Sequence, residues 1–104
     1  MSSDFVFRLQ GEIEATVLLL MGDLTISGLD KACASLGRAL QGRQVSEISL
    51  AGLRRADSGA IALLVDFFAQ ARAAHKPAPR IRDLPTHLKE LVELYHLQHV
   101  FSLV

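Results

Sequence analysis

The spacing of hydrophobic positions changes along the chain and predicts alternating strands and helices. In four short segments, apolar residues alternate with polar ones or form a continuous run, which is typical of strands. In three longer segments they recur every three or four residues, which is typical of amphipathic helices. The predicted strands are 5–9, 15–21, 45–50 and 80–82, and the predicted helices are 29–40, 57–74 and one that begins at residue 86.

Turn-forming and capping residues stand at the ends of these segments. Ser27 and Thr86 are predicted to cap the first and last helices, since a hydroxyl can accept a hydrogen bond from a free backbone N–H group. Pro77 and Pro79 follow the second helix and stop it. Gly11 closes the first strand, so a hairpin is expected to join it to the second.

The order of the predicted elements, β-β-α-β-α-β-α, defines an α/β fold class. Strand–helix–strand units form right-handed parallel crossovers, whereas the opening hairpin adds an antiparallel edge. We therefore expect one domain over residues 1–104, with a mixed four- or five-stranded sheet and helices mainly on one face. The continuous apolar run at 17–21 predicts a strand buried on both faces.

The hydrophobic content and the net charge indicate which kind of partner the chain can bind. Half of the 104 residues are hydrophobic, which excludes a disordered chain and suffices for one core. The 11 basic and 11 acidic residues cancel, so nucleic acid is not an expected partner. A net charge of zero gives little repulsion against association, so we expect a protein partner, with a homodimer as a further option.

Other sequence features favour a cytoplasmic location. The longest apolar runs, 17–21 and 60–65, are far shorter than the roughly 20 residues that cross a bilayer, so no membrane span is predicted. The first residues lack the basic and apolar regions of a signal peptide. The single cysteine, Cys33, suits a reducing compartment and is expected to pack as a small hydrophobic residue.

Residue types that carry catalysis or bind metals do not form a motif. The four histidines are predicted to be solvated and no cofactor or metal is expected; they are His75, His87, His96 and His99. The surroundings of Ser58 do not match the Gly-x-Ser-x-Gly pattern of hydrolases. We therefore predict that the chain is not an enzyme.

The most informative stretch joins a predicted strand to a strongly apolar helix through Asp57, Ser58 and Gly59. Loops at the carboxyl ends of parallel strands often carry function, and the N-terminus of a helix favours an anion. A phosphoryl group on Ser58 would place its negative charge there. The structural alternative is that Asp57 or Ser58 simply caps the helix, and the two interpretations are compatible.

Residues around this stretch are candidates for a contact surface. Arg54 and Arg55, in a predicted turn, can pair with a phosphate or with an acidic partner. Phe67 and Phe68 are adjacent on a helix, so at least one is expected to leave the innermost core. The apolar tail 100–104 is a second candidate surface. Ala60, Ile61 and Phe67 complete the predicted partner interface.

Three segments resemble the STAS domain family, named after sulfate transporters and anti-sigma factor antagonists. They are Gly22-Asp23-Leu24-Thr25, the stretch 53–64 and the final segment 88–97. The resemblance covers nearly the whole chain. It implies that Ser58 occupies the position of the phosphorylatable Ser or Thr and Asp57 that of the acidic residue before it. Asp23 would be an acidic neighbour on the same surface, with Thr25 and Gly59 in supporting positions.

The same resemblance implies two functions. Antagonists of this family usually have one more residue between the hydroxyl residue and the glycine, whereas Gly59 follows Ser58 directly. This spacing is more similar to MlaB-type subunits, which bind the ATPase of a bacterial phospholipid ABC transporter. Such a subunit would be cytoplasmic and peripheral to the inner membrane. The alternative is an anti-sigma factor antagonist, whose binding to a kinase that regulates a sigma factor is blocked by phosphorylation of Ser58.

Overall fold

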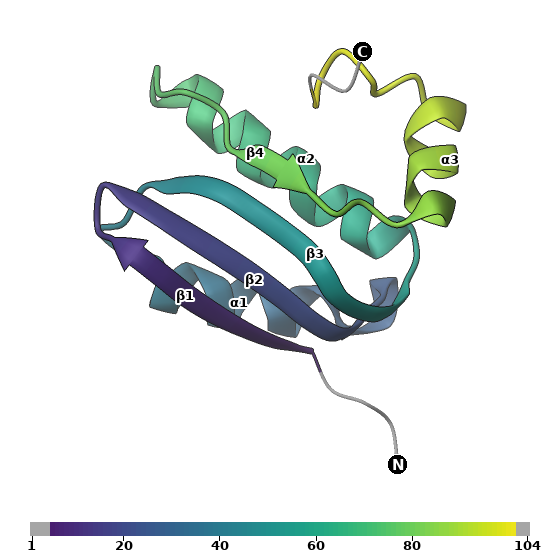
Figure 1. The fold of residues 1–104 in the computed structure, drawn as a ribbon, viewed down its shortest axis with the longest axis horizontal. Coiled ribbons are helices and arrows are strands. Elements are labelled where there is room, and N and C mark those ends of the chain that lie inside the picture. The colour runs from purple at the N-terminus through teal and green to yellow at the C-terminus, as the bar shows by residue number, and fades with distance from the viewer. Residues whose placement is uncertain (1–4, 102–104) are drawn as a thin grey trace.

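The fold begins with an antiparallel hairpin. In the computed structural model, which describes residues 5–101, β1 (Val6–Glu12) pairs with β2 (Ala15–Leu24) around a turn at residues 13 and 14. Both strands are longer than the spacing of hydrophobic residues predicted. The expected hairpin is present, and it forms one margin of the sheet (Figure 1).

Two parallel strands complete a four-stranded sheet in the order β1-β2-β3-β4. They are β3 (Val45–Ala56) and the short β4 (Arg80–Arg82). β3 does not end at residue 50 as predicted, because its ladder with β2 continues past irregularities in register as far as Ala56. Arg54 and Arg55 therefore lie in a strand, and their prediction as turn residues is wrong.

The helices α1 (Leu29–Ala39) and α2 (Ser58–Ala73) both lie behind the sheet in Figure 1, and α3 (Thr86–Leu94) packs beside α2. The core forms between this helical layer and the sheet. Its fully buried side chains include Leu18 and Leu20 from β2, Ile48 and Leu50 from β3, and Leu63 and Leu64 from α2. The expected mixed sheet with helices on one face is confirmed.

Within residues 5–101, no helix lies over the opposite face of the sheet. In β2, Thr16, Leu18 and Leu20 are buried, whereas the alternate residues Val17 and Leu19 are only half-buried. The prediction of a strand fully buried on both faces is therefore wrong. In the apolar run 17–21, one face of β2 is buried in the core and the other is covered only in part by neighbouring side chains.

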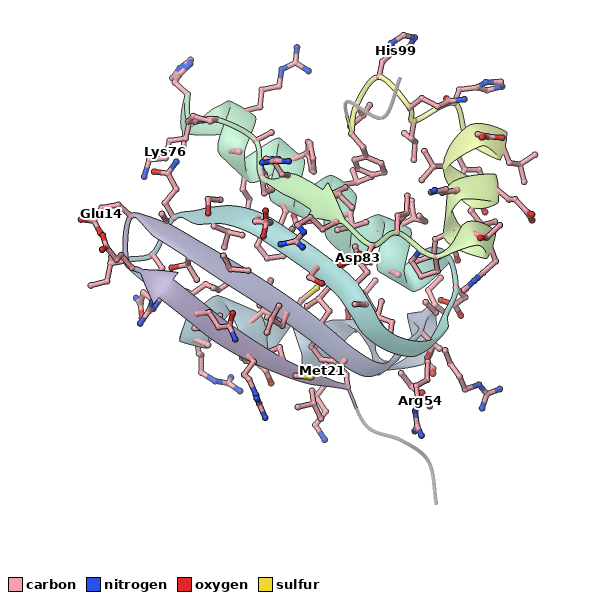
Figure 2. The ribbon with its side chains drawn as sticks, viewed as in Figure 1. Glu14, Met21, Arg54, Lys76, Asp83 and His99 are labelled. Atoms are coloured by element: carbon pink, nitrogen blue, oxygen red, sulfur yellow. The ribbon has the colours of Figure 1, made fainter. Side chains whose placement is uncertain are left out.

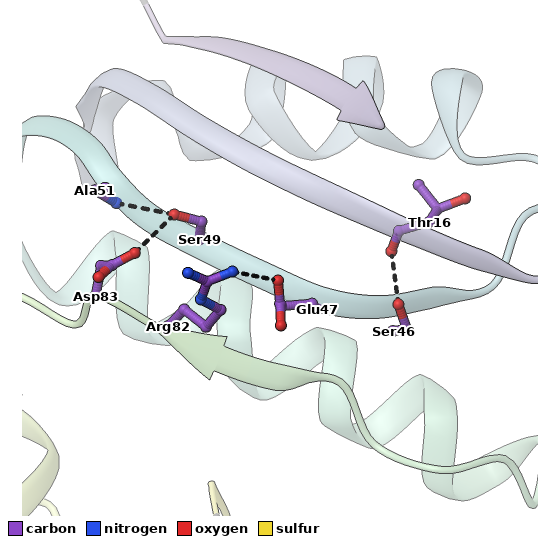
Figure 3. Close-up of polar contacts among 7 residues, drawn as sticks. All are labelled: Thr16, Ser46, Glu47, Ser49, Ala51, Arg82 and Asp83. Carbon is purple, nitrogen blue, oxygen red and sulfur yellow. Dashed lines mark hydrogen bonds and ion pairs between the residues drawn. The ribbon is translucent and has the colours of Figure 1, made fainter. Parts of the chain in front are cut away.

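Polar contacts on this second face attach the short strand β4 (Figure 3). The Arg82 guanidinium donates to a Glu47 carboxylate oxygen at 2.9 Å, and the bond to Glu47 raises the pKa of Arg82. The Ser49 hydroxyl donates to the Asp83 carboxylate at 3.2 Å. These side chains link β3 to β4 and the residue after it, where the backbone ladder is short.

Both predicted hydroxyl caps are absent. Ser27 belongs to a single 3-10 turn, η1 (Ile26–Gly28), and Gly28 precedes α1 without a side-chain hydrogen bond. Thr86 is the first residue of α3 rather than its cap, because Pro85 precedes the helix and its carbonyl accepts the first helical bonds. In each case the hydroxyl residue lies one position away from the capping position, which Gly28 and Pro85 occupy.

The end of the chain contributes to the core. Phe101 is only 3% exposed and packs edge-on against Phe68, with ring centroids 5.1 Å apart. The prediction that this tail is a contact surface is therefore wrong for Phe101, whereas Val100 is exposed. The remainder of the predicted surface, 102–104, lies outside the described residues.

A groove of about 360 Å³ lies between α1 and α2, near the C-terminal ends of both helices. Its lining includes Cys33, Leu36 and Phe67. Burial raises the pKa of the Cys33 thiol, and the carboxylates of Asp66 and Asp30 raise it further. Cys33 is thus a partly buried residue packed against the core, as the sequence predicted.

Replacing Phe101 by Ala should destabilise the fold by about 3 kcal/mol, because it removes a buried aromatic ring and its edge-on contact. The matched control is Val100→Ala, which should change the free energy of unfolding by less than about 0.5 kcal/mol. Urea denaturation of both variants measures the difference. Equal stability of the two variants would contradict a tail packed in the core.

Alkylation of Cys33 should be slow at pH 8 in the native protein, since a raised pKa leaves little thiolate. The rate should continue to increase above pH 9, the ordinary value for this thiol. Mass spectrometry of samples treated with iodoacetamide follows the reaction, with the urea-unfolded chain as control. Equal rates in the native and unfolded states would show that the thiol is not shielded.

Candidate functional site

One carboxylate oxygen joins two loops at the carboxyl end of the sheet. Asp57 caps α2, and its Oδ1 accepts hydrogen bonds from the Gly59 N–H at 2.7 Å and the Ile26 N–H at 2.9 Å. The Asp57 backbone is extended, and its carbonyl oxygen accepts the Ala60 N–H at 3.0 Å. The turn after β2 and the start of α2 are therefore held together by a single side chain.

Gly59 allows the two segments to approach each other. A Cβ atom at this position would lie 2.5 Å from the Ile26 nitrogen and 2.6 Å from the Thr25 carbonyl carbon. These backbone atoms cannot move away without breaking the hydrogen bond between Ile26 and Asp57. Gly59 is therefore needed for close packing of the η1 turn on α2.

Ser58 is the first residue of α2 and is half-buried. Its hydroxyl makes no hydrogen bond to any of the residues that the structure describes. Because Asp57 fills the capping role, the Ser58 hydroxyl is not needed to start the helix. The helix dipole makes this end of α2 favourable for negative charge.

A second part of the predicted site surrounds an open cavity of about 720 Å³ next to the η1 turn. Asp23, Thr25 and Arg55 line it together with Phe7 and Lys31. Asp23 Oδ1 is buried and has no hydrogen-bond partner within residues 5–101. The Thr25 and Ser27 hydroxyls lie 3.1 Å apart, within hydrogen-bond distance. Thr25 connects the two parts of the site, because it lines this cavity and its backbone packs against Gly59.

The predicted interface residues separate into exposed and buried ones. Arg54 and Arg55 are exposed, and Figure 2 shows Arg54 directed away from the body of the protein. Ala60 and Ile61 are 0% and 4% exposed, so their prediction as contact residues is wrong. They face the core because the helix turns them toward the sheet. Phe67 lines the distant groove between α1 and α2.

The solvent-facing side of α2 starts at Ser58. One row along this side is exposed and small or β-branched, namely Ala62, Val65 and Ala69, and the exposed Asp66 and Gln70 lie beside it. Val65, which belongs to the apolar run 60–65, is 36% exposed. We call Ser58, Ala62, Val65 and Ala69 the α2 face.

Two residues at the site were not identified from the sequence. Ile26 is 62% exposed beside Asp57, although its N–H is bound to that carboxylate. His87, predicted to be merely solvated, has its Nε2 3.0 Å from the Ala56 carbonyl oxygen. Since a carbonyl only accepts, Nε2 carries the proton. Both contacts join residues 31 positions apart, and no local sequence signal reports such pairs.

Among residues 5–101, no group of three His, Cys, Asp or Glu side chains could hold a metal ion. None of the helices there has the length and apolar character required to cross a bilayer.

The mixed sheet and its one-sided helices define a small α/β domain, with a hydroxyl residue, Ser58, at the start of α2. A family model described as "Mlab, STAS domain" matches residues 7–104. The chain therefore belongs to the STAS domain family.

A solved structure shares this fold. It is described as the anti-sigma factor antagonist SpoIIAA in its unphosphorylated form. The match has a TM-score of 0.61 and 21% sequence identity, and covers 88% of this chain and 82% of that one. The comparison with curated proteins found no match.

Replacing Asp57 by Ala should destabilise the protein by about 2 kcal/mol, because two backbone N–H groups lose their acceptor. Ser58→Ala is the control and should change the stability by less than about 0.5 kcal/mol, since no bond is lost. Thermal and urea unfolding measure both. A Ser58→Ala variant as unstable as Asp57→Ala would show that Ser58 also supports the helix.

Proposed function

We propose that the chain is a non-catalytic docking subunit that binds the ATPase of a phospholipid-transport ABC complex through the α2 face and Ile26. The main support for this proposal is that Asp57 and Ser58 have different roles at the start of α2. Asp57 holds the backbone, and this leaves the Ser58 hydroxyl without a structural role. A polar group that the fold does not use, at the end of an exposed helix face, is available to a partner.

The chemistry of the α2 face suits a protein partner. Ala62 and Ala69 are small and exposed, so a partner helix can approach the α2 backbone closely, and Val65 adds apolar area between them. Ile26 stands beside the same helix end with 62% of its surface exposed, as an apolar anchor would. Arg54 supplies positive charge nearby and would favour an acidic rim on the partner.

The MlaB-type family match supports an ATPase as the partner. The direct succession of Ser58 and Gly59 supports the same choice. Docking would stabilise one conformation of the ATPase and shift its activity only as far as the affinities for its conformations differ. The protein would then be cytoplasmic and reach the inner membrane only through the transporter.

The free Ser58 hydroxyl also favours a second candidate function, that of an anti-sigma factor antagonist switched by a kinase. A phosphate on Ser58 would meet the positive end of a 16-residue helix, so the fold would tolerate it. It would add a charge of about −1.5 to −2 to the α2 face. An apolar or acidic partner surface would then be repelled.

Capture of the tagged chain from its native cell, followed by mass spectrometry, tests the leading proposal. An ABC ATPase should be retained, and Val65→Glu should weaken its binding at least about tenfold by placing a charge in the apolar face. The matched control is Val100→Glu, the same change at an exposed valine outside the α2 face. Absence of any ABC ATPase, or equal binding by both variants, would refute the proposal.

Incubation with the candidate anti-sigma kinase and ATP tests the second function. Intact-mass measurement should show one added phosphoryl group in the wild type and none in Ser58→Ala. Ser58→Asp should mimic the modified form and reduce kinase binding. An unmodified wild type, together with unchanged binding by Ser58→Asp, would exclude the switch.

A further inference from the structure

The strand β1 forms a bare edge of the sheet. In the order β1-β2-β3-β4 it pairs only with β2, and Figure 1 shows no other segment of residues 5–101 beyond it. One row of its backbone N–H and C=O groups therefore lacks a strand partner within that range. Proline or a covering loop commonly blocks such edges, and neither is present along Val6–Glu12.

The side chains of β1 form a pattern that is complementary to itself. Arg8, Gln10 and Glu12 are exposed and alternate along the strand, so they share one face. Read along the chain, they are a cation, an amide and an anion. An antiparallel copy centred on Gln10 places each Arg8 opposite Glu12 of the other copy and the two Gln10 amides opposite each other. A parallel copy would instead oppose Arg8 to Arg8.

The other face of the strand fits the same register. Leu9 lies opposite Gly11 of the second copy, which has no side chain to obstruct it. Phe7 is half-buried and packs against the core of its own chain, so it leaves this edge free. One register thus satisfies the charges on one face and meets no obstruction on the other.

We propose that β1 is a self-association surface on which a second copy of this chain adds its own β1 antiparallel, with a two-fold axis through Gln10. The two sheets join into one, and the free backbone groups of each edge pair with the other. Since α2 lies behind the β4 side of the sheet (Figure 1), the α2 face stays open. The paired form can therefore bind two partner molecules.

Exchange of the two charges tests the register. Sedimentation equilibrium of the wild type over a range of concentrations should show a mass approaching twice 11.4 kDa. Arg8→Glu and Glu12→Arg should each weaken the association by about tenfold or more, because like charges then face each other twice. The double variant R8E/E12R restores both attractions and should recover the association of the wild type.

The control is Lys89→Glu, which changes the net charge as Arg8→Glu does but lies exposed on α3. It should associate like the wild type. Circular dichroism of every variant checks that the fold is intact. A monomeric wild type, or a dimer that both single variants leave unchanged, would overturn the proposal. Failure of the folded double variant to recover would overturn the register and with it the proposed surface.

Discussion

The arrangement of the site depends on the two hydrogen bonds that Asp57 Oδ1 accepts. One comes from the first turn of its own helix and the other from Ile26, which is 31 residues earlier in the chain. Each N–H group would otherwise lack a partner at a crowded junction, where an unsatisfied donor costs about 1–3 kcal/mol. The negative charge also lies at the positive end of α2. A single carboxylate therefore satisfies a local and a long-range requirement together.

Two consequences of this interaction determine the surface. Gly59 must lack a side chain, because any Cβ would collide with the backbone that Asp57 draws in. Ser58 is released from capping, so its hydroxyl stands at the start of the α2 face without a structural role. Ile26 is held by its backbone, and this leaves its apolar side chain exposed. The backbone here is therefore fixed by hydrogen bonds, while the side chains of Ser58 and Ile26 remain available for contact, which suits the proposed docking surface.

The sequence predicted local features better than distant ones. The residues 57–59 predicted both the start of a helix and a candidate site. The helix start was predictable because capping depends on residues that are neighbours in the sequence. The contacts of Ile26 and His87 join segments far apart, and the packing of Phe101 against Phe68 depends on where the chain returns. Spacing alone could not locate these contacts. The extension of β3 likewise follows from its pairing with β2 and not from its own residues.

The spacing of apolar residues does not distinguish buried from exposed positions in α2. The segment 60–65 is apolar throughout, so its periodicity is weak and Ile61 and Val65 look equivalent in the sequence. In the fold, the sheet covers Ile61, whereas none of the described elements buries Val65. Only the position of the helix on the sheet distinguishes a core residue from a contact residue here.

Hydrogen exchange of the chain, with and without the proposed ATPase partner, tests docking through the α2 face. Binding should slow exchange of the backbone amides in the η1 turn and along α2 from Ser58 to Ala69. Amides of β4 should exchange at unchanged rates. Protection confined to the groove between the ends of α1 and α2, or to the uncovered face of the sheet, would contradict a docking surface organised by Asp57.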